Sequence, residues 1–199
     1  QGPVEIPLDV ILDDPEIEFS SLYRLADVRL VRPVRVTVPV KPGFLKALRL
    51  AAALQLPVRL LPGQPGEDVL EELAEAVRFY LTDPAVEAPV EFFHSTLARY
   101  LGGGPGTMWD FLEQDPALFA LPVPAGETPV PVDFVETHVA GLVARGAECA
   151  NCRWLDVCAG YFKRPDPAYD CAGVKEIFGL LKSAAEEMTR DLAARDVEP

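Results

Sequence analysis

All four cysteines of this chain lie between residues 149 and 171, and the 148 residues before them contain none. Their spacing is C-x2-C-x5-C-x12-C, formed by Cys149, Cys152, Cys158 and Cys171. Two thiols that are two residues apart lie on one tight turn, where both can bind the same metal centre. We therefore expect the chain to fold around a site that these four side chains close together.

Composition and charge narrow the class of protein. The chain has 199 residues, 49% of them hydrophobic, which suits one large domain or one domain with a small appendix. Its formal net charge of −13 argues against nucleic acid and anionic membranes as partners, because phosphate binding needs clustered Lys and Arg. We find no apolar run of about 18 residues, the length of a membrane span. No secretory signal is visible either. We expect a cytoplasmic protein.

The N-terminal half alternates between strand and helix patterns. Residues 34–38 give the clearest strand, because Val34, Val36 and Val38 fall on one face and Arg35 and Thr37 on the other. Further strands are predicted at 56–61 and 89–93, with an edge strand within 4–12, and helices are predicted at 44–55, 68–81 and 95–101. Such alternation is typical of βα units on a parallel sheet. We predict an α/β fold with about three βα units in residues 4–101, as a small open sheet or a partial barrel.

The character of the chain changes after residue 101. Residues 102–132 are rich in glycine and proline and are interpreted as a linker segment. Residues 133–199 are predicted to form a cysteine-rich module with helices at 133–145 and 174–194. The two histidines, His94 and His138, take part in no Ser-His-Asp order that the sequence lets us assemble, so acyl-transfer catalysis has no support.

Three interpretations of the cysteines compete. Two disulfides are disfavoured in a reducing cytoplasm. A structural zinc site usually pairs two C-x2-C turns, whereas here the second pair of cysteines is split by twelve residues. A [4Fe-4S] cluster needs one thiolate at each of its irons and can draw them from a wider loop system. Apolar neighbours would shield such a cluster from water: Trp154, Leu155, Val157, Tyr161 and Phe162. We favour the cluster and keep zinc as the alternative.

The cysteine segment also resembles a known family. The order Cys149-x2-Cys152-x-Trp154-x3-Cys158-x-Gly160, followed by Cys171, is similar to the second half of the SPASM domain. That domain is the C-terminal auxiliary-cluster module of radical S-adenosylmethionine enzymes that modify peptides and proteins. The resemblance covers residues 148–173 only. It implies that the four cysteines are the ligands of one auxiliary [4Fe-4S] cluster.

Two departures from that family change the expected role. The family usually places another cysteine four positions after the third, and Phe162 stands there in this chain. The radical signature C-x3-C-x2-C is absent from the sequence. The resemblance therefore implies at most one cluster and no cleavage of S-adenosylmethionine by this chain alone. We expect an accessory protein with an electron-transfer or substrate-holding role, whose partner is a protein or peptide, such as a separate catalytic subunit.

Overall fold

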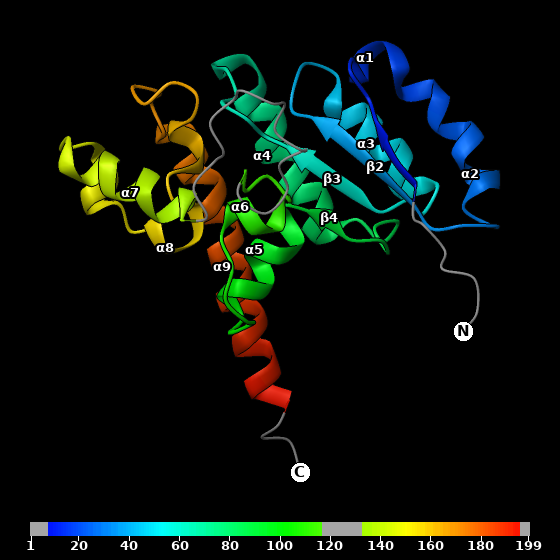
Figure 1. Cartoon of the computed structure of the whole chain (residues 1–199). Helices are drawn as coiled ribbons and strands as arrows, with labels where there is room; N and C mark the ends of the chain where they lie inside the picture. The colour runs from blue at the N-terminus through cyan, green and yellow to red at the C-terminus, as the bar shows by residue number, and fades with distance from the viewer. Residues whose placement is uncertain (1–7, 117–132, 196–199) are drawn as a thin grey trace, which may run out of the picture.

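A computed structural model describes residues 8–116 and 133–195, and its ordered centre is a parallel sheet (Figure 1). In the described ranges the sheet has four strands in the order β1-β2-β3-β4. Their bounds are β1 (Leu8–Ile11), β2 (Val34–Pro39), β3 (Val58–Leu61) and β4 (Val90–Glu91). The predicted α/β class and parallel sheet are confirmed. The part of the predicted edge strand before residue 8 lies outside the described residues.

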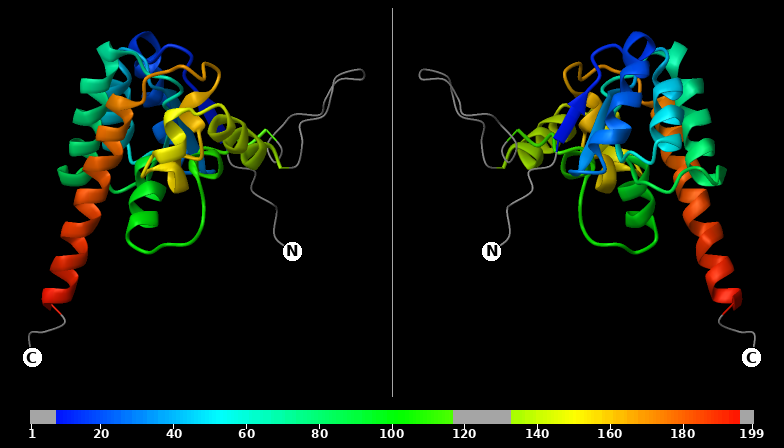
Figure 2. Two further views of the ribbon diagram at one scale, coloured as in Figure 1. Left: turned by 90° about the vertical axis from the view of Figure 1, so that its left-hand side faces the viewer. Right: turned by 90° about the vertical axis from the view of Figure 1, so that its right-hand side faces the viewer.

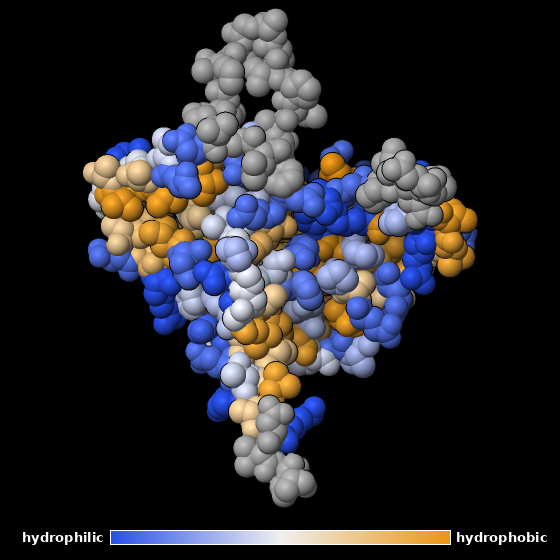
Figure 3. Space-filling view, turned by 60° about the horizontal axis from the view of Figure 1, so that its bottom comes forward, coloured by the Kyte–Doolittle hydropathy of each residue, from blue (hydrophilic) through white to orange (hydrophobic). Residues whose placement is uncertain are grey.

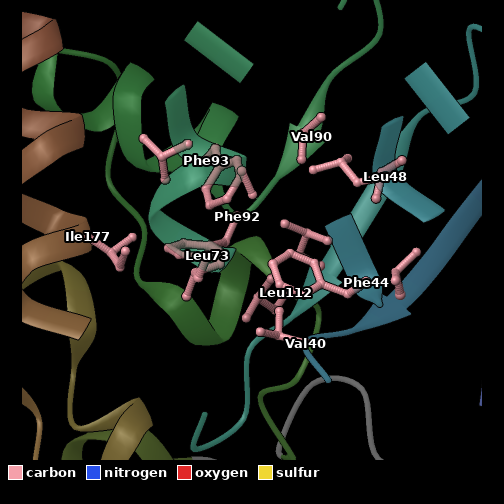
Figure 4. Close-up of a cluster of buried hydrophobic side chains, with 14 of the residues drawn as sticks. Val40, Phe44, Leu48, Leu73, Val90, Phe92, Phe93, Leu112 and Ile177 are labelled. Carbon is pink, nitrogen blue, oxygen red and sulfur yellow. The ribbon is translucent and has the colours of Figure 1, made fainter. Parts of the chain in front are cut away.

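Helices connect the strands as the alternation predicted. The connections are α3 (Phe44–Ala53) between β2 and β3, α4 (Glu67–Thr82) between β3 and β4, and α5 (Phe93–Tyr100) after β4. Their apolar stripes are buried, because each helix covers part of the core with one face. In Figure 4, Phe44 and Leu48 of α3 point toward Val90 and Leu112 in this core.

The connection between β1 and β2 is helical, which the sequence analysis did not predict. It consists of α1 (Pro15–Glu18), the 3₁₀ helix η1 (Phe19–Arg24) and α2 (Leu25–Val28). Asp14 starts it, because its side chain accepts hydrogen bonds from the backbone N–H groups of Glu16 and Ile17. Pro15 stands at the first helical position, where its missing N–H costs no hydrogen bond.

The two faces of the sheet differ in chemistry. Val34, Val36 and Val38 are buried, as the alternation predicted. On the opposite face, charged side chains of the strands form an ion-pair network with Glu113, in which Arg59 lies 2.6 Å from Asp9 and 2.5 Å from Glu113. The parallel register explains this placement, because it sets Asp9 beside Arg35 and Thr37 beside Arg59. Arg35 completes the network with ion pairs to the same two carboxylates.

The C-terminal part is helical and packs on the βα part. It contains α6 (Met108–Phe111), α7 (Phe134–Ala144), η2 (Glu148–Asn151), α8 (Leu155–Cys158), η3 (Tyr161–Lys163) and α9 (Ala172–Arg195). Helices α7 and α9 match the two helices predicted there. Helix α9 lies along α4 and α5, and its C-terminal end projects from the body (Figures 1 and 2). None of the described helices is long and apolar enough to cross a lipid bilayer.

The projecting end of α9 is mixed in character. Met188 and Leu192 are exposed there among charged residues. Figure 3 views the molecule toward this end, where hydrophilic and apolar side chains alternate over the surface.

One hydrophobic core includes both parts of the chain. Phe92 and Phe93 follow β4, and Ile177 of α9 lies close by in the same cluster (Figure 4). The rings of Phe92 and Phe178 are 6.5 Å apart between centroids in an edge-on arrangement. The cysteine segment is therefore built onto the βα part through a shared core. The division into a βα domain, a linker and a module stays a prediction, and residues 117–132 of the predicted linker lie outside the described residues.

Candidate metal centre: a cavity lined by four cysteines

The four cysteines lie on the wall of one small cavity. The cavity lies between the cysteine segment and the first turns of α9. Its lining consists of Glu148, Cys149, Cys152, Trp154, Leu155, Cys158, Phe162, Lys163, Cys171, Val174, Lys175 and Phe178. All four thiols are free, with no disulfide among them. The structure thus brings the four candidate ligands from the sequence to one place.

Short helical turns position the first three cysteines. Cys149 lies in η2, Cys152 caps the end of η2, and Cys158 is the last residue of α8. The chain then reverses through two residues in the left-handed region, Ala159 at φ 46° and Gly160 at φ 71°. A side chain at Gly160 would meet the Leu142 Cδ1 atom at 2.7 Å, so the reversal needs glycine there.

Helices α6 and α7 hold that reversal from behind. The indole N–H of Trp109 donates to the carbonyl of Ala159 at 3.0 Å. His138 Nε2 lies 3.0 Å from the carbonyl oxygen of Gly160. His138 therefore has a positioning contact with the turn after Cys158. His94 lies 3.2 Å from the Tyr80 hydroxyl, and neither histidine is among the described residues that line the cavity.

The fourth cysteine is placed by contacts with the sheet. The side-chain amide of Gln64, in the loop after β3, donates to the carbonyls of Phe162 at 3.0 Å and Asp166 at 2.7 Å. The Tyr169 hydroxyl donates to the carbonyl of Pro65 at 2.8 Å. These bonds fix the excursion between the third and fourth cysteines, which ends at Cys171 directly before α9.

Aromatic and aliphatic side chains close the cavity. Trp154 and Phe178 stack at 5.7 Å between ring centroids, and Phe162 meets Phe178 edge-on at 6.0 Å. Of the five side chains expected to shield a cluster, Trp154, Leu155 and Phe162 line the cavity. The other two, Val157 and Tyr161, are buried elsewhere in the core.

Two lysines and one glutamate form the charged part of the wall. Lys163 is only 5% exposed, and its ammonium donates to Glu148 Oε1 at 2.6 Å and to the carbonyl of Tyr169. Lys175 donates to the other carboxylate oxygen of Glu148. The cavity wall therefore carries two positive charges against one negative charge.

The sequence analysis missed this group of charges. Two of these residues could have been placed near the cysteines from the sequence alone. Glu148 precedes Cys149 directly, and Lys175 lies one helical turn after Cys171. The burial of Lys163 could not be predicted from its neighbours in sequence, because it depends on how the chain folds back to bring the Tyr169 carbonyl to the ammonium group.

Burial favours the neutral form of Cys149, Cys158 and Cys171. It raises the pKa of Cys149, that of Cys158 to about 11 and that of Cys171 to about 12. Burial also opposes the ionisation of Glu148, but hydrogen bonds from Lys163 and Lys175 outweigh it and lower the pKa of Glu148 to about 2. A metal that binds here must displace protons from sulfur, so its affinity rises with pH.

The four cysteines line the cavity, but in the described residues their side chains are not gathered around one metal position. Within residues 8–116 and 133–195, no three or more His, Cys, Asp or Glu side chains are grouped so as to hold a metal ion. The role of the four cysteines as ligands remains a prediction.

Comparison of the chain with protein families, with curated proteins and with solved structures finds no match. The similarity to SPASM domains therefore rests on residues 148–173 alone.

Proposed function

We propose that this chain binds one [4Fe-4S] cluster through Cys149, Cys152, Cys158 and Cys171. It would act in the cytoplasm as an electron-transfer or substrate-holding partner of a separate catalytic subunit that modifies peptides or proteins. The observation that carries the proposal is the common cavity, on whose wall all four thiols lie. When bound, the cluster supplies a one-electron redox centre or a rigid cross-link.

The donor set supports a cluster. Four thiolates provide one ligand for each iron, and no other residue type is needed. A zinc ion would draw its four sulfurs to about 2.3 Å from a single point. Among the described residues the sulfurs border a common cavity and are not grouped around one point, which suits a larger body better. The uneven C-x2-C-x5-C-x12-C spacing agrees with this preference.

The wall supports a buried, negatively charged metal–thiolate group. The aromatic rings of Trp154, Phe162 and Phe178 limit the access of water. Lys163 and Lys175 place positive charge beside the sulfurs, which favours their deprotonated form once metal binds. Burial alone would disfavour that form.

The assignment to peptide or protein modification rests on the SPASM-like order of the cysteines. Because the chain lacks C-x3-C-x2-C, a catalytic subunit has to supply the chemistry. The chain would then hold or extend the active site of that subunit.

Metal analysis after anaerobic purification tests the proposal. We expect about four irons and four sulfides per chain and a brown colour that dithionite bleaches. A colourless protein with one zinc would overturn the cluster. To test the accessory role, the tagged chain is purified from its native cells under the same conditions. Recovery of a peptide-modifying enzyme with it is expected, and recovery of the chain alone counts against the role.

A further inference from the structure

A surface groove borders Trp154, which also lines the cysteine cavity. It lies between α4, α9 and the residues that lead into α8. Its lining consists of Ala74, Arg78, Arg153, Trp154, Glu176, Gly179, Leu180, Lys182, Ser183 and Glu186. Among the described residues, Trp154 is the one side chain that belongs to both linings.

The groove gathers positive charge in an acidic protein. Three cations come to it from three segments: Arg78 from α4, Arg153 from the turn before α8, and Lys182 from α9. They outnumber the two carboxylates of the lining, Glu176 and Glu186. The whole chain, in contrast, has a formal net charge of −13.

Two of the three cations lie over aromatic rings. The guanidinium carbon of Arg153 lies 4.3 Å from the centre of the Trp154 ring. The ammonium of Lys182 lies 5.4 Å from the centre of the Tyr100 ring and 3.7 Å from Glu186 Oε1. Arg78 is exposed. Such stacking keeps a charge in place while leaving its N–H groups available to a partner.

We propose that this groove is the docking site of a small acidic electron-carrier protein. The occupant follows from two observations together. The cations favour an acidic surface, since opposite charge steers association and selects partners. Trp154 lines both the groove and the thiol-lined cavity, so a carrier docked here would lie next to a side chain that forms part of the cavity wall. The identity of the carrier rests on the proposed function, whereas the preference for an acidic surface does not.

Titration calorimetry with an acidic [2Fe-2S] ferredoxin as the probe tests the site on the full chain as purified. The groove variant carries Arg78→Glu, Arg153→Glu and Lys182→Glu together. The matched control carries Arg24→Glu, Arg145→Glu and Arg195→Glu, three exposed arginines outside the groove with the same change in net charge. Circular dichroism and metal content of both variants are measured alongside.

We expect the groove variant to bind the ferredoxin at least about tenfold more weakly than the wild type, and the control to change by less than about threefold. Binding to the wild type should weaken with added salt. Equal losses in both variants would overturn the site, since they would show an effect of net charge alone. A poly-glutamate peptide that binds as tightly as the ferredoxin would overturn the assignment to an electron carrier.

The two proposals fail separately. If the protein holds iron but its binding does not depend on the groove charges, only the docking site is overturned. If it holds zinc or no metal, and ferredoxin binding still depends on the groove, the acidic docking surface stands and the proposed cluster is overturned.

Discussion

Trp154 and Phe178 stack with their ring centroids 5.7 Å apart and their planes 30° from parallel. This contact joins the cysteine segment to α9. Phe178 also meets Phe162 of the cavity wall and Phe92 of the βα part edge-on. One ring of α9 therefore connects the wall of the candidate metal centre with the core of the sheet.

Replacement of the Phe178 ring should lower the stability of the fold. Phe178 is 2% exposed, so we expect Phe178→Ala to lower the free energy of unfolding by about 3–5 kcal/mol, because a buried ring is replaced by a void. Urea denaturation measures the change. Leu192→Ala on the projecting end of the same helix is the control, with an expected change within about 0.5 kcal/mol. Similar losses in the two variants would contradict the packing described here.

Loss of the fourth thiol tests the ligand set. Cys171→Ala should lower iron occupancy well below that of the wild type after anaerobic purification, because one iron loses its protein ligand. The control is Met188→Ala, which removes an exposed sulfur from α9 and should leave the iron content unchanged. Full occupancy in Cys171→Ala would show that Cys171 is not a ligand.

Among the two lysines of the cavity wall, the buried Lys163 is expected to contribute more to stability than the half-buried Lys175. Lys163→Met removes the donor to Glu148 and to the carbonyl of Tyr169, and we expect a loss of about 1–3 kcal/mol in the free energy of unfolding. Lys175→Met leaves the Lys163–Glu148 pair intact and should cost less. Thermal denaturation of both variants compares them. A larger effect at Lys175 would contradict the assigned contacts.

The ion-pair network on the sheet predicts a dependence of stability on pH. Burial opposes the ionisation of Asp9, but hydrogen bonds from Arg35 and Thr37 and the nearby positive charges outweigh it and lower the pKa of Asp9 below 3.8. The hydrogen bond from Arg35 likewise lowers the pKa of Glu113 below 4.5, against the effect of burial. Below these values the unfolded chain binds protons that the folded chain resists. The stabilisation is therefore present in full above about pH 5 and is lost as the pH falls through the lowered pKa values.

The double variant Asp9→Asn, Glu113→Gln tests this pH dependence. Denaturation midpoints measured from pH 6 down to pH 3 should fall less steeply for the variant than for the wild type. The control Glu186→Gln changes an exposed carboxylate on α9 and should keep the wild-type slope. Identical slopes in the wild type and the double variant would contradict the network.

Local sequence patterns predicted most strands and helices, whereas contacts between residues far apart in the sequence were not predicted. The alternation in β2 and the apolar stripes of α3 and α4 are set by residues within one turn or one strand, so the sequence alone reveals them. In the ion-pair network, Arg35 is 26 positions from Asp9 and 78 positions from Glu113, so no local sequence pattern predicts these contacts. The helical connection before β2 was missed for another reason, because its short helices depend on a cap and contain too few turns to show a period.

For the candidate site, the sequence likewise predicted the local part and missed the contributions of distant segments. The spacing of the cysteines predicted that they would meet at one place, and the structure places them around one cavity. Much of the wall, in contrast, comes from α9 through Val174, Lys175 and Phe178, which the cysteine motif does not include. Their contribution depends on how α9 packs against α4 and α5, and that packing is decided by the whole core.

The hydrogen bonds of Gln64 and Tyr169 have a consequence for the order of folding. Gln64 and Asp166 are 102 positions apart, so the chain must close a long loop before the excursion that ends at Cys171 can be fixed. Because loop entropy is lost before such a distant contact stabilises the chain, we expect contacts of this length to form late in folding. The complete set of four thiols is thus a property of the finished fold. A synthetic peptide of residues 148–173 would contain every cysteine and lack the scaffold that arranges them.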